Sequence, residues 1–150
     1  CLKTNADLDI FEVTSIDTDE HYRLYAAYIE SRHHDGDMYP PQREQYASFL
    51  SNQWGSTRYF EYRSRGQLLA VAVSDLLDDG LSAIYTFFSP EDNRRSLGSF
   101  AILQQIEHCI SEELPYLYLG YWIKECAKMS YKTRFRPLEL MINNRWLDLS

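Results

Sequence analysis

The chain has 150 residues and a mass of 17.7 kDa, which predicts one domain over residues 1–150 with a single core. Apolar residues make up 45% and aromatic residues 15% of the chain, and this composition excludes an intrinsically disordered protein. The net charge of −7 argues against a general nucleic-acid binder, and neither a long apolar run nor a secretory signal occurs, so we expect a cytoplasmic protein without a membrane partner.

The cysteines indicate free thiols rather than a disulfide framework or a zinc site. They are Cys1, Cys109 and Cys126, which are odd in number and contain no C-x-x-C pair. The histidines and aspartates of residues 33–37 are consecutive at a predicted helix end, where a cap and turn is favoured over convergence on one metal ion. We therefore expect no metal. The first residue is Cys rather than Met, and we expect the chain to be a fragment of a longer protein.

The first third of the chain predicts one strand and two helices. A strand is expected near residues 10–14, and Asp19 can cap a helix over residues 20–33 whose apolar residues recur at helical spacing. Gly36 ends that helix, and a second helix is expected after Pro41.

The middle of the chain predicts a three-stranded meander. Strands are expected over residues 58–63, 68–76 and 81–88, where β-branched and aromatic residues are frequent. Turns are expected between them at residues 65–66 and 78–80, because both segments contain glycine.

The remainder predicts helix, strand, helix and strand. Ser96 can cap a helix whose apolar stripe comprises Leu97, Phe100, Leu103, Ile106, Ile110 and Leu114. A strand over residues 116–122, a helix over 124–134 and a strand over 138–142 follow. This order resembles the GCN5-related N-acetyltransferase fold, an α+β fold with a mixed, mostly antiparallel sheet flanked by helices.

Two segments are candidates for binding phosphate. Arg95, Gly98 and Ser99 lie where a loop becomes a helix, and exposed N–H groups there can hold an anion, although a capped helix with a tight turn is the simpler interpretation. The segment resembles the acetyltransferase pyrophosphate loop, except that bulky Phe100 stands at its last position. Residues 124–136 contain five basic residues against one acidic residue.

Three of these basic residues, Lys124, Lys128 and Lys132, share one face of the predicted helix because they are four residues apart. Polyphosphate binding and an ordinary solvated face explain this stripe equally well.

Strand residues supply the candidates for the chemistry. Tyr85 and Tyr121 belong to aromatic strands whose side chains mostly form the core, yet in the acetyltransferase fold two such strands part and frame the active cleft. A tyrosine hydroxyl there can hold an acyl or ester group. Asp75 is the one aspartate near a strand interior, where it could act as a base or bind an amine, with a turn-forming role as the alternative.

Several long segments resemble the C-terminal domain of arginyl-tRNA-protein transferases and of their bacterial relatives, the aspartate/glutamate leucyltransferases. These segments are residues 79–88, 96–103, 118–132 and 134–139, with shorter matches at 5–8 and 31–33. The ending near Trp146 resembles the bacterial branch and favours leucine over arginine. The cysteine-rich N-terminal region of that family has no counterpart in these residues.

The resemblance implies an enzyme that transfers leucine or arginine from an aminoacyl-tRNA to a protein that begins with Asp or Glu, in the N-degron pathway of protein degradation. No cofactor is expected for this part of the protein. In the mechanism that we derive from this activity, Tyr85, Asp75 and Tyr121 are catalytic. The tRNA-binding residues are Arg95, Gly98, Ser99, Lys124 and Lys128. The acceptor-binding residues are Arg58, Arg63 and Lys132.

Two other functions stay open on the sequence. One is a coenzyme A-dependent N-acetyltransferase, which has the same fold and also acylates amines. The other is a module that binds tRNA or degrons without catalysis.

Overall fold

The structure is a computed structural model that describes residues 5–32, 39–49, 56–91, 95–120, 132, 134–135, 137–142 and 144–148. The chain divides into two compact units, Cys1–Tyr118 and Leu119–Ser150. The single domain predicted for residues 1–150 remains a prediction. Among the described residues, no helix combines the length and the apolar character needed to cross a membrane.

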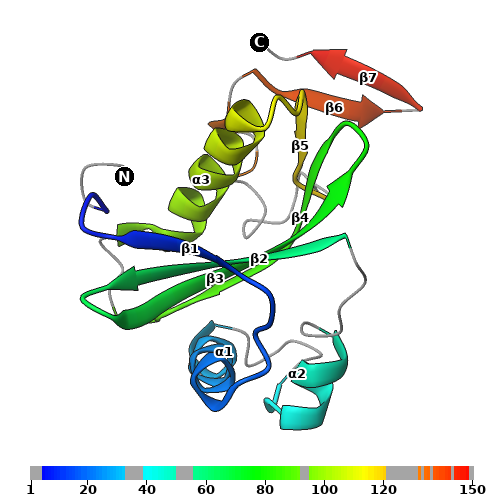
Figure 1. The fold of residues 1–150 in the computed structure, drawn as a ribbon. Coiled ribbons are helices and arrows are strands. Elements are labelled where there is room, and N and C mark those ends of the chain that lie inside the picture. Colours follow the sequence, from blue (N-terminus) through cyan, green and yellow to red (C-terminus); the bar gives the residue numbers. More distant parts are fainter. Residues whose placement is uncertain are drawn as a thin grey trace. The chain divides into compact units, whose positions relative to one another are not determined.

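The first unit is built on a five-stranded sheet in the order β1-β2-β3-β4-β5 (Figure 1). Its strands are β1 (Asp9–Val13), β2 (Thr57–Ser64), β3 (Gln67–Leu77), β4 (Gly80–Phe88) and β5 (Tyr116–Tyr118). The first four strands pair antiparallel, and β4 pairs with β5 in parallel. The predicted meander is therefore confirmed as β2, β3 and β4.

Helices cover both faces of this sheet, with α1 (Asp19–Arg32) and α2 (Arg43–Phe49) on one side and α3 (Leu97–Ser111) on the other (Figure 1). A buried cluster that includes Tyr25, Tyr46 and Phe87 fills the α1 side. A second cluster that includes Tyr62 and Phe100 fills the α3 side. The sheet is thus the middle layer between two apolar cores.

The start of α1 corrects one predicted cap. The helix begins at Asp19, but the hydroxyl Oγ1 of Thr18 accepts the hydrogen bond from the backbone N–H of His21, at 3.2 Å. Thr18 is therefore the N-cap, one residue earlier than predicted, because its short side chain reaches the N3 amide.

The buried face of α3 also differs from the predicted stripe. The helix begins after Ser96 as expected, but Ser96 has φ +49° and makes no side-chain cap hydrogen bond. Ile110, predicted to be inward, is 65% exposed, whereas Gln105 is only 2% exposed. Gln105 is buried because its Oε1 accepts a hydrogen bond from the Ser74 hydroxyl, at 2.6 Å, so a polar contact with the sheet sets part of the inward face.

The second unit contains a hairpin of β6 (Glu139–Ile142) and β7 (Arg145–Asp148), of which β7 was not predicted. The strand predicted over residues 116–122 ends at Tyr118, and Gly120 has φ +83°, a turn conformation that glycine adopts readily. The predicted helix over residues 124–134 lies almost wholly outside the described residues, and His33, His34 and Gly36 lie outside them too.

Candidate active site

The parting of β4 and β5 defines the candidate site. Only Gly80–Ser82 of β4 pairs with β5, opposite Tyr116–Tyr118, whereas β4 continues to Phe88. A side-chain carbon at Gly80 would lie 2.1 Å from the carbonyl oxygen of Tyr116, so only glycine allows this close approach. Beyond Ser82, the described residues leave one edge of β4 without a paired strand, and its backbone groups can meet a ligand.

A β-bulge lies where this pairing ends. Val73 of β3 pairs with Tyr85 and Ser74 pairs with Ala83, so Ile84 is the extra residue in β4 and is 45% exposed. Bulges often stand beside active sites because they bend the strand and redirect its side chains. The structure therefore supplies both an open strand edge and a local bend at one place.

Tyr85, a predicted catalytic residue, lies half-buried at this bend and faces α1. Its ring packs edge-on against Tyr28, with ring centroids 6.2 Å apart, and near Phe87 at 6.4 Å. Burial, with smaller contributions from Tyr28 and Tyr25, raises the pKa of Tyr85 above its usual value. The hydroxyl therefore keeps its proton at neutral pH and can donate a hydrogen bond.

Asp75, the second predicted catalytic residue, lies on the same face of the sheet as Tyr85. Val73 pairs with Tyr85, and Asp75 stands two residues further along β3, so strand alternation places both side chains on the α1 side. Asp75 is half-buried and accepts a hydrogen bond from the Thr57 hydroxyl, at 2.9 Å. Burial, and next the charge of Asp75, raise the pKa of Tyr59, which faces the same side.

The predicted phosphate-binding loop is held by the N-terminal turn. The guanidinium of Arg95 donates to both carboxylate oxygens of Asp7, at 2.8 and 3.0 Å, and its carbonyl accepts from the Asn5 amide at 2.6 Å. Hydrogen bonds from Arg95 and then Ser64 hold the pKa of Asp7 well below its usual range. Arg95 thus fixes the loop before α3 through an ion pair that the sequence did not reveal.

Gly98 and Ser99 lie in the first turn of α3 as predicted. A side-chain carbon at Gly98 would lie 3.4 Å from the ring of Phe88, at ordinary van der Waals distance, so the start of the helix lies against the end of β4. The N–H groups of this first turn lack intrahelical partners by geometry. An anion beside the open end of β4 could meet them.

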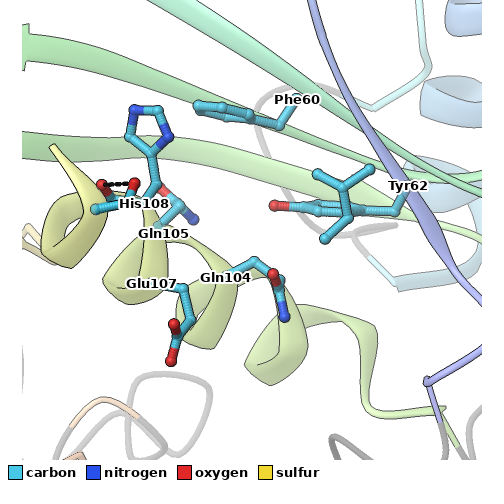
Figure 2. A pocket seen from close by; sticks show the side chains of 8 residues that line it. Phe60, Tyr62, Gln104, Gln105, Glu107 and His108 are labelled. Atoms are coloured by element: carbon cyan, nitrogen blue, oxygen red, sulfur yellow. Dashed lines mark hydrogen bonds between the residues drawn. The ribbon is translucent and has the colours of Figure 1, made fainter.

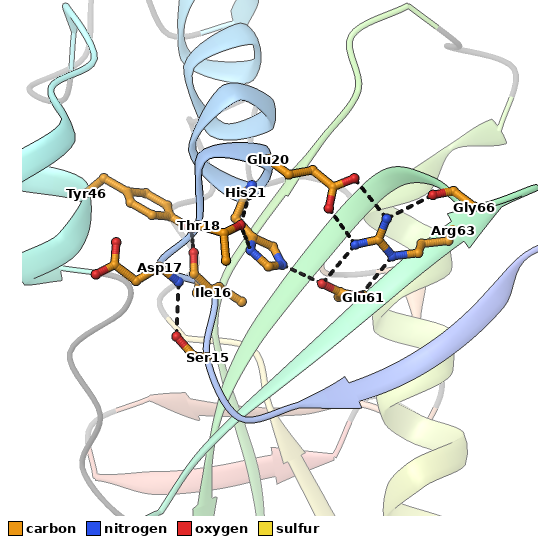
Figure 3. Close-up of polar contacts among 10 residues, drawn as sticks. All are labelled: Ser15, Ile16, Asp17, Thr18, Glu20, His21, Tyr46, Glu61, Arg63 and Gly66. Atoms are coloured by element: carbon orange, nitrogen blue, oxygen red, sulfur yellow. Dashed lines mark hydrogen bonds and ion pairs between the residues drawn. The ribbon is translucent and has the colours of Figure 1, made fainter.

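Arg63, a predicted acceptor-binding residue, is already fully engaged (Figure 3). Its guanidinium donates to both carboxylate oxygens of Glu20, to both of Glu61 and to the carbonyl of Gly66, at 2.7 to 3.3 Å. These are all five N–H donors of an arginine. An acceptor carboxylate would have to displace one of them.

Glu61 also accepts a hydrogen bond from a buried histidine. His21 and Glu61 are 4% and 6% exposed, and Nε2 of His21 lies 2.5 Å from Glu61 Oε2. Burial acts to raise the pKa of Glu61, but hydrogen bonds from Arg63 and His21 outweigh it and hold the pKa below its usual value. Thr18 contacts the other ring nitrogen of His21, so α1 is joined to β2 by a continuous polar network.

The other predicted site residues are spread over the chain. Arg58 lies on β2 and shares the α3 side with Phe60, away from Tyr85, and it donates to the carbonyl of Thr57 at 3.2 Å. Lys132 belongs to the second unit, where its ammonium would lie 3.8 Å from a side-chain carbon at Gly120. Tyr121, Lys124 and Lys128 lie outside the described residues.

Sequence analysis did not identify the polar residues whose hydrogen bonds hold the elements around the site together. They are Asn5, Asp7, Thr18, His21, Glu61 and Gln105. Each is separated from its partner by a loop or several elements, except the Thr18 cap, so no local spacing pairs them. A buried position in a strand pattern, as for Glu61 between Phe60 and Tyr62, is the one available signal. Among the described residues, no three His, Cys, Asp or Glu side chains gather as metal ligands would.

Residues 20–142 match the protein family described as "Arginine-tRNA-protein transferase, C terminus". The chain is 60% identical over 148 residues to the aspartate/glutamate leucyltransferase of Saccharophagus degradans, covering 98% of this chain and 63% of that protein. It is 54% identical to the enzyme of the same name from Teredinibacter turnerae, covering 99% of this chain and 62% of the relative. The chain therefore spans somewhat less than two thirds of the relatives it matches.

Two solved structures are similar in fold. The ribosomal-protein-S18-alanine N-acetyltransferase of Escherichia coli has a TM-score of 0.59 at 16% identity, covering 84% of this chain and 75% of that one. The ribosomal-protein-alanine N-acetyltransferase of Brucella melitensis biovar Abortus has a TM-score of 0.61 at 15% identity, covering 85% and 89%. The predicted acetyltransferase-like α+β fold is thereby confirmed.

Proposed function

Because this chain belongs to the arginine-tRNA-protein transferase family, we propose that it is the catalytic part of an enzyme that transfers leucine from leucyl-tRNA to a protein beginning with Asp or Glu. The strongest support is the identity of 60% to an aspartate/glutamate leucyltransferase over nearly the whole chain. Leucine is preferred to arginine as the donor because relatives that are 54% to 60% identical to this chain carry the leucyltransferase name. Action in the N-degron pathway and in the cytoplasm belongs to the same proposal.

The protein contributes to this reaction mainly by positioning the two reactants. The aminoacyl ester of a charged tRNA is already activated, and an N-terminal α-amine has a pKa of about 7.7 to 8.0, so an appreciable fraction is neutral at cellular pH. The amine attacks the ester carbonyl, the new amide forms, and the tRNA leaves with its terminal hydroxyl. Holding the two reactants at about 3 to 3.5 Å contributes much of the rate.

We propose that the aminoacyl ester binds at the open edge of β4. The backbone of β4 beyond Ser82, which no strand among the described residues pairs, and the protonated hydroxyl of Tyr85 can donate hydrogen bonds to the carbonyl oxygen, on which negative charge develops. Asp75, on the same face, is proposed to accept the proton from the attacking amine or to orient it. Tyr121 is proposed to complete this catalytic group.

Both macromolecular partners present negative charge, the tRNA through its phosphates and the acceptor through its acidic side chain, so positive groups are needed at two places. The N-terminus of α3 at Gly98 and Ser99, fixed by Arg95, is proposed to meet the 3′ end of the tRNA together with Lys124 and Lys128. Arg58, Arg63 and Lys132 are the proposed partners of the acidic acceptor residue. Among the three, Arg63 ranks last because all its donors are occupied by Glu20, Glu61 and Gly66.

A transfer assay with the full-length protein tests the proposal. Radiolabelled leucyl-tRNA and arginyl-tRNA are offered with peptides that begin with Asp, Glu or Ala. We expect label from leucyl-tRNA in the Asp and Glu peptides and none in the Ala peptide. Transfer to all three peptides alike, or acetylation of the amine with acetyl-coenzyme A and no transfer from tRNA, would contradict it.

The lysine assignment has its own test. The triple variant Lys124→Ala, Lys128→Ala and Lys132→Ala is expected to bind tRNA more weakly and with a shallower salt dependence, because fewer counterions are released. Unchanged affinity and salt slope would remove these residues from the tRNA site. Transfer in the variant at saturating tRNA then separates weaker binding from slower chemistry.

A further inference from the structure

Two buried tyrosine hydroxyls on the α1 side of the sheet have no hydrogen-bond partner among the described residues. They belong to Tyr25 of α1 and Tyr59 of β2, which are 0% and 1% exposed. Tyr46, in the same buried cluster, differs because its hydroxyl donates to the carbonyl of Ile16. A buried hydroxyl without a partner destabilises the folded chain, and phenylalanine would fill the same space without that cost. Folding alone therefore does not explain a hydroxyl at either position.

Both side chains lie on the face of the sheet that carries the residues assigned to transfer. Tyr59 and Tyr85 stand opposite the same residue of β3, and Asp75 lies two residues further along that strand. Strand alternation places all three side chains on the α1 side. The ring of Tyr25 packs edge-on against Phe87, with centroids 5.7 Å apart, and the centroid of Phe87 is 6.4 Å from that of Tyr85. The two unpaired hydroxyls thus belong to the surroundings of the candidate active site.

The unpaired hydroxyls and the reaction groups also act on one another electrostatically. Burial, and next the charge of Asp75, raise the pKa of Tyr59. Burial raises the pKa of Tyr85, and Tyr28 and then Tyr25 add to this effect. Such effects require that the titrating oxygens lie near one another. The α1 side of the sheet therefore brings together hydroxyl oxygens, one carboxylate and several aromatic rings.

The opposite face of the sheet offers a contrast. A pocket of about 310 Å³ lies there between α3 and the outer strands, lined in part by Phe60 and Tyr62, and the side chain of Glu107 points away from both rings (Figure 2). The buried side chains without a hydrogen-bond partner among the described residues are Tyr25 and Tyr59, on the other face. Unpaired polar groups therefore mark the α1 side rather than this pocket.

The groups gathered on the α1 side suit an amine. An ammonium group donates three hydrogen bonds and accepts none, so it matches hydroxyl oxygens and a carboxylate. The faces of tyrosine rings also attract a cation, whereas Asp75 would repel a phosphate or a carboxylate. Both substrates of the proposed transfer carry an amine. It is the α-amine of the leucyl donor or the N-terminal amine of the acceptor.

We propose that the hydroxyls of Tyr25 and Tyr59, together with Asp75, bind the amine of a transfer substrate next to the ester carbonyl. This inference rests on the proposed function and names the substrate group that the same site recognises. Tyr25 and Tyr59 determine specificity in it, because an analogue without the amine leaves their hydroxyls unpaired. Both hydroxyls are enclosed, so binding requires a side-chain movement. The half-buried Tyr85 packs against the cluster at the open edge of β4 and is placed to make it.

Two pairs of small probes test for the amine without tRNA. The ester pair is leucine methyl ester and methyl isocaproate, which lacks only the α-amine. The peptide pair is one peptide that begins with Asp, with a free or an acetylated N-terminus. In calorimetric titrations of the full-length protein, we expect at least one amine-bearing probe to bind at least about tenfold more tightly than its partner. The pair that shows this preference identifies the source of the amine, and equal or undetectable binding within both pairs would overturn the proposal.

Phenylalanine variants locate the amine. Tyr59→Phe and Tyr25→Phe are each expected to reduce the preference by about threefold to tenfold, with an unchanged or higher urea midpoint because no hydrogen bond within the chain is lost. Tyr46→Phe is the matched control, since it removes the same atom in the same cluster but breaks the bond to Ile16. It should lower the urea midpoint and keep the preference. A preference that is unchanged in both Tyr59→Phe and Tyr25→Phe, or that falls equally in Tyr46→Phe, would also overturn the proposal.

The transfer assay with leucyl-tRNA separates this inference from the proposed function. If the wild-type protein transfers leucine but binds both members of each probe pair equally, only the amine site is refuted. If the amine preference is present and depends on Tyr59, but no leucine is transferred from tRNA, the amine site stands and the proposed function fails.

Discussion

Replacing Glu61 with alanine should cost far more stability than removal of an ordinary surface carboxylate. The change deletes the acceptor of one hydrogen bond from His21 and two from Arg63, and it leaves the imidazole buried without that partner. Removing one member of a buried ion pair costs about 3 to 5 kcal/mol. For a domain with an unfolding free energy of about 5 to 15 kcal/mol, this is a large share.

Urea denaturation of the full-length protein measures this effect. With an m-value of about 2 kcal/mol per molar, the midpoint of Glu61→Ala should fall by about 1.5 to 2.5 M at neutral pH. Glu61→Gln keeps an oxygen acceptor and should lose less, and Glu30→Gln, on the exposed surface of α1, should change little.

The stability lost in Glu61→Ala is expected to depend on pH. The folded-state pKa of Glu61 is lowered, so its stabilisation is complete above the unfolded pKa of about 4.3 and is lost as the pH falls through the folded value. The stability gap between wild type and Glu61→Ala should therefore narrow below about pH 4. A cost under about 1 kcal/mol at neutral pH, or a gap that stays constant into acid, would refute the reasoning.

Three further predictions concern the parted strands and their support. Gly80→Ala places a methyl group against the backbone of Tyr116, so urea denaturation should show a loss of about 1 to 3 kcal/mol, accompanied by weaker transfer. Ser74→Ala leaves the buried amide oxygen of Gln105 without its donor and should cost about 1 to 3 kcal/mol in the same measurement. Tyr85→Phe keeps the ring contacts and should lower kcat by about a hundredfold in the transfer assay, with little change in stability.

Each of these predictions has a contradicting outcome. Wild-type stability in Gly80→Ala would mean that β4 and β5 do not approach as closely as described. An unchanged midpoint in Ser74→Ala would remove the polar contact between β3 and α3. For Tyr85→Phe, wild-type kcat would exclude the hydroxyl from the reaction. Tyr46→Phe, on α2 in the buried core, is the control hydroxyl deletion for kcat; it also removes the hydrogen bond to the carbonyl of Ile16 and is therefore expected to lower stability.

The sequence predicts the main elements well because their patterns are local. The meander follows from alternating residues and from turns at Gly66 and Gly80, and α3 follows from its apolar spacing. The inward face of α3 could not be predicted in full, because Gln105 is drawn inward by Ser74, which is distant in sequence. Likewise β5 is shorter than its apolar run suggests, since the chain turns at Gly120.

The candidate site was only partly predictable for a related reason. Tyr85 and Asp75 lie on one face of the sheet because the register of β3 and β4 places them there, and the bulge at Ile84 is not visible in residue types. Arg63 was named as a candidate for pairing with the acidic side chain of the acceptor, but Glu20, Glu61 and Gly66 already accept its hydrogen bonds. Its five contacts depend on α1 and a turn, which only the folded chain brings together.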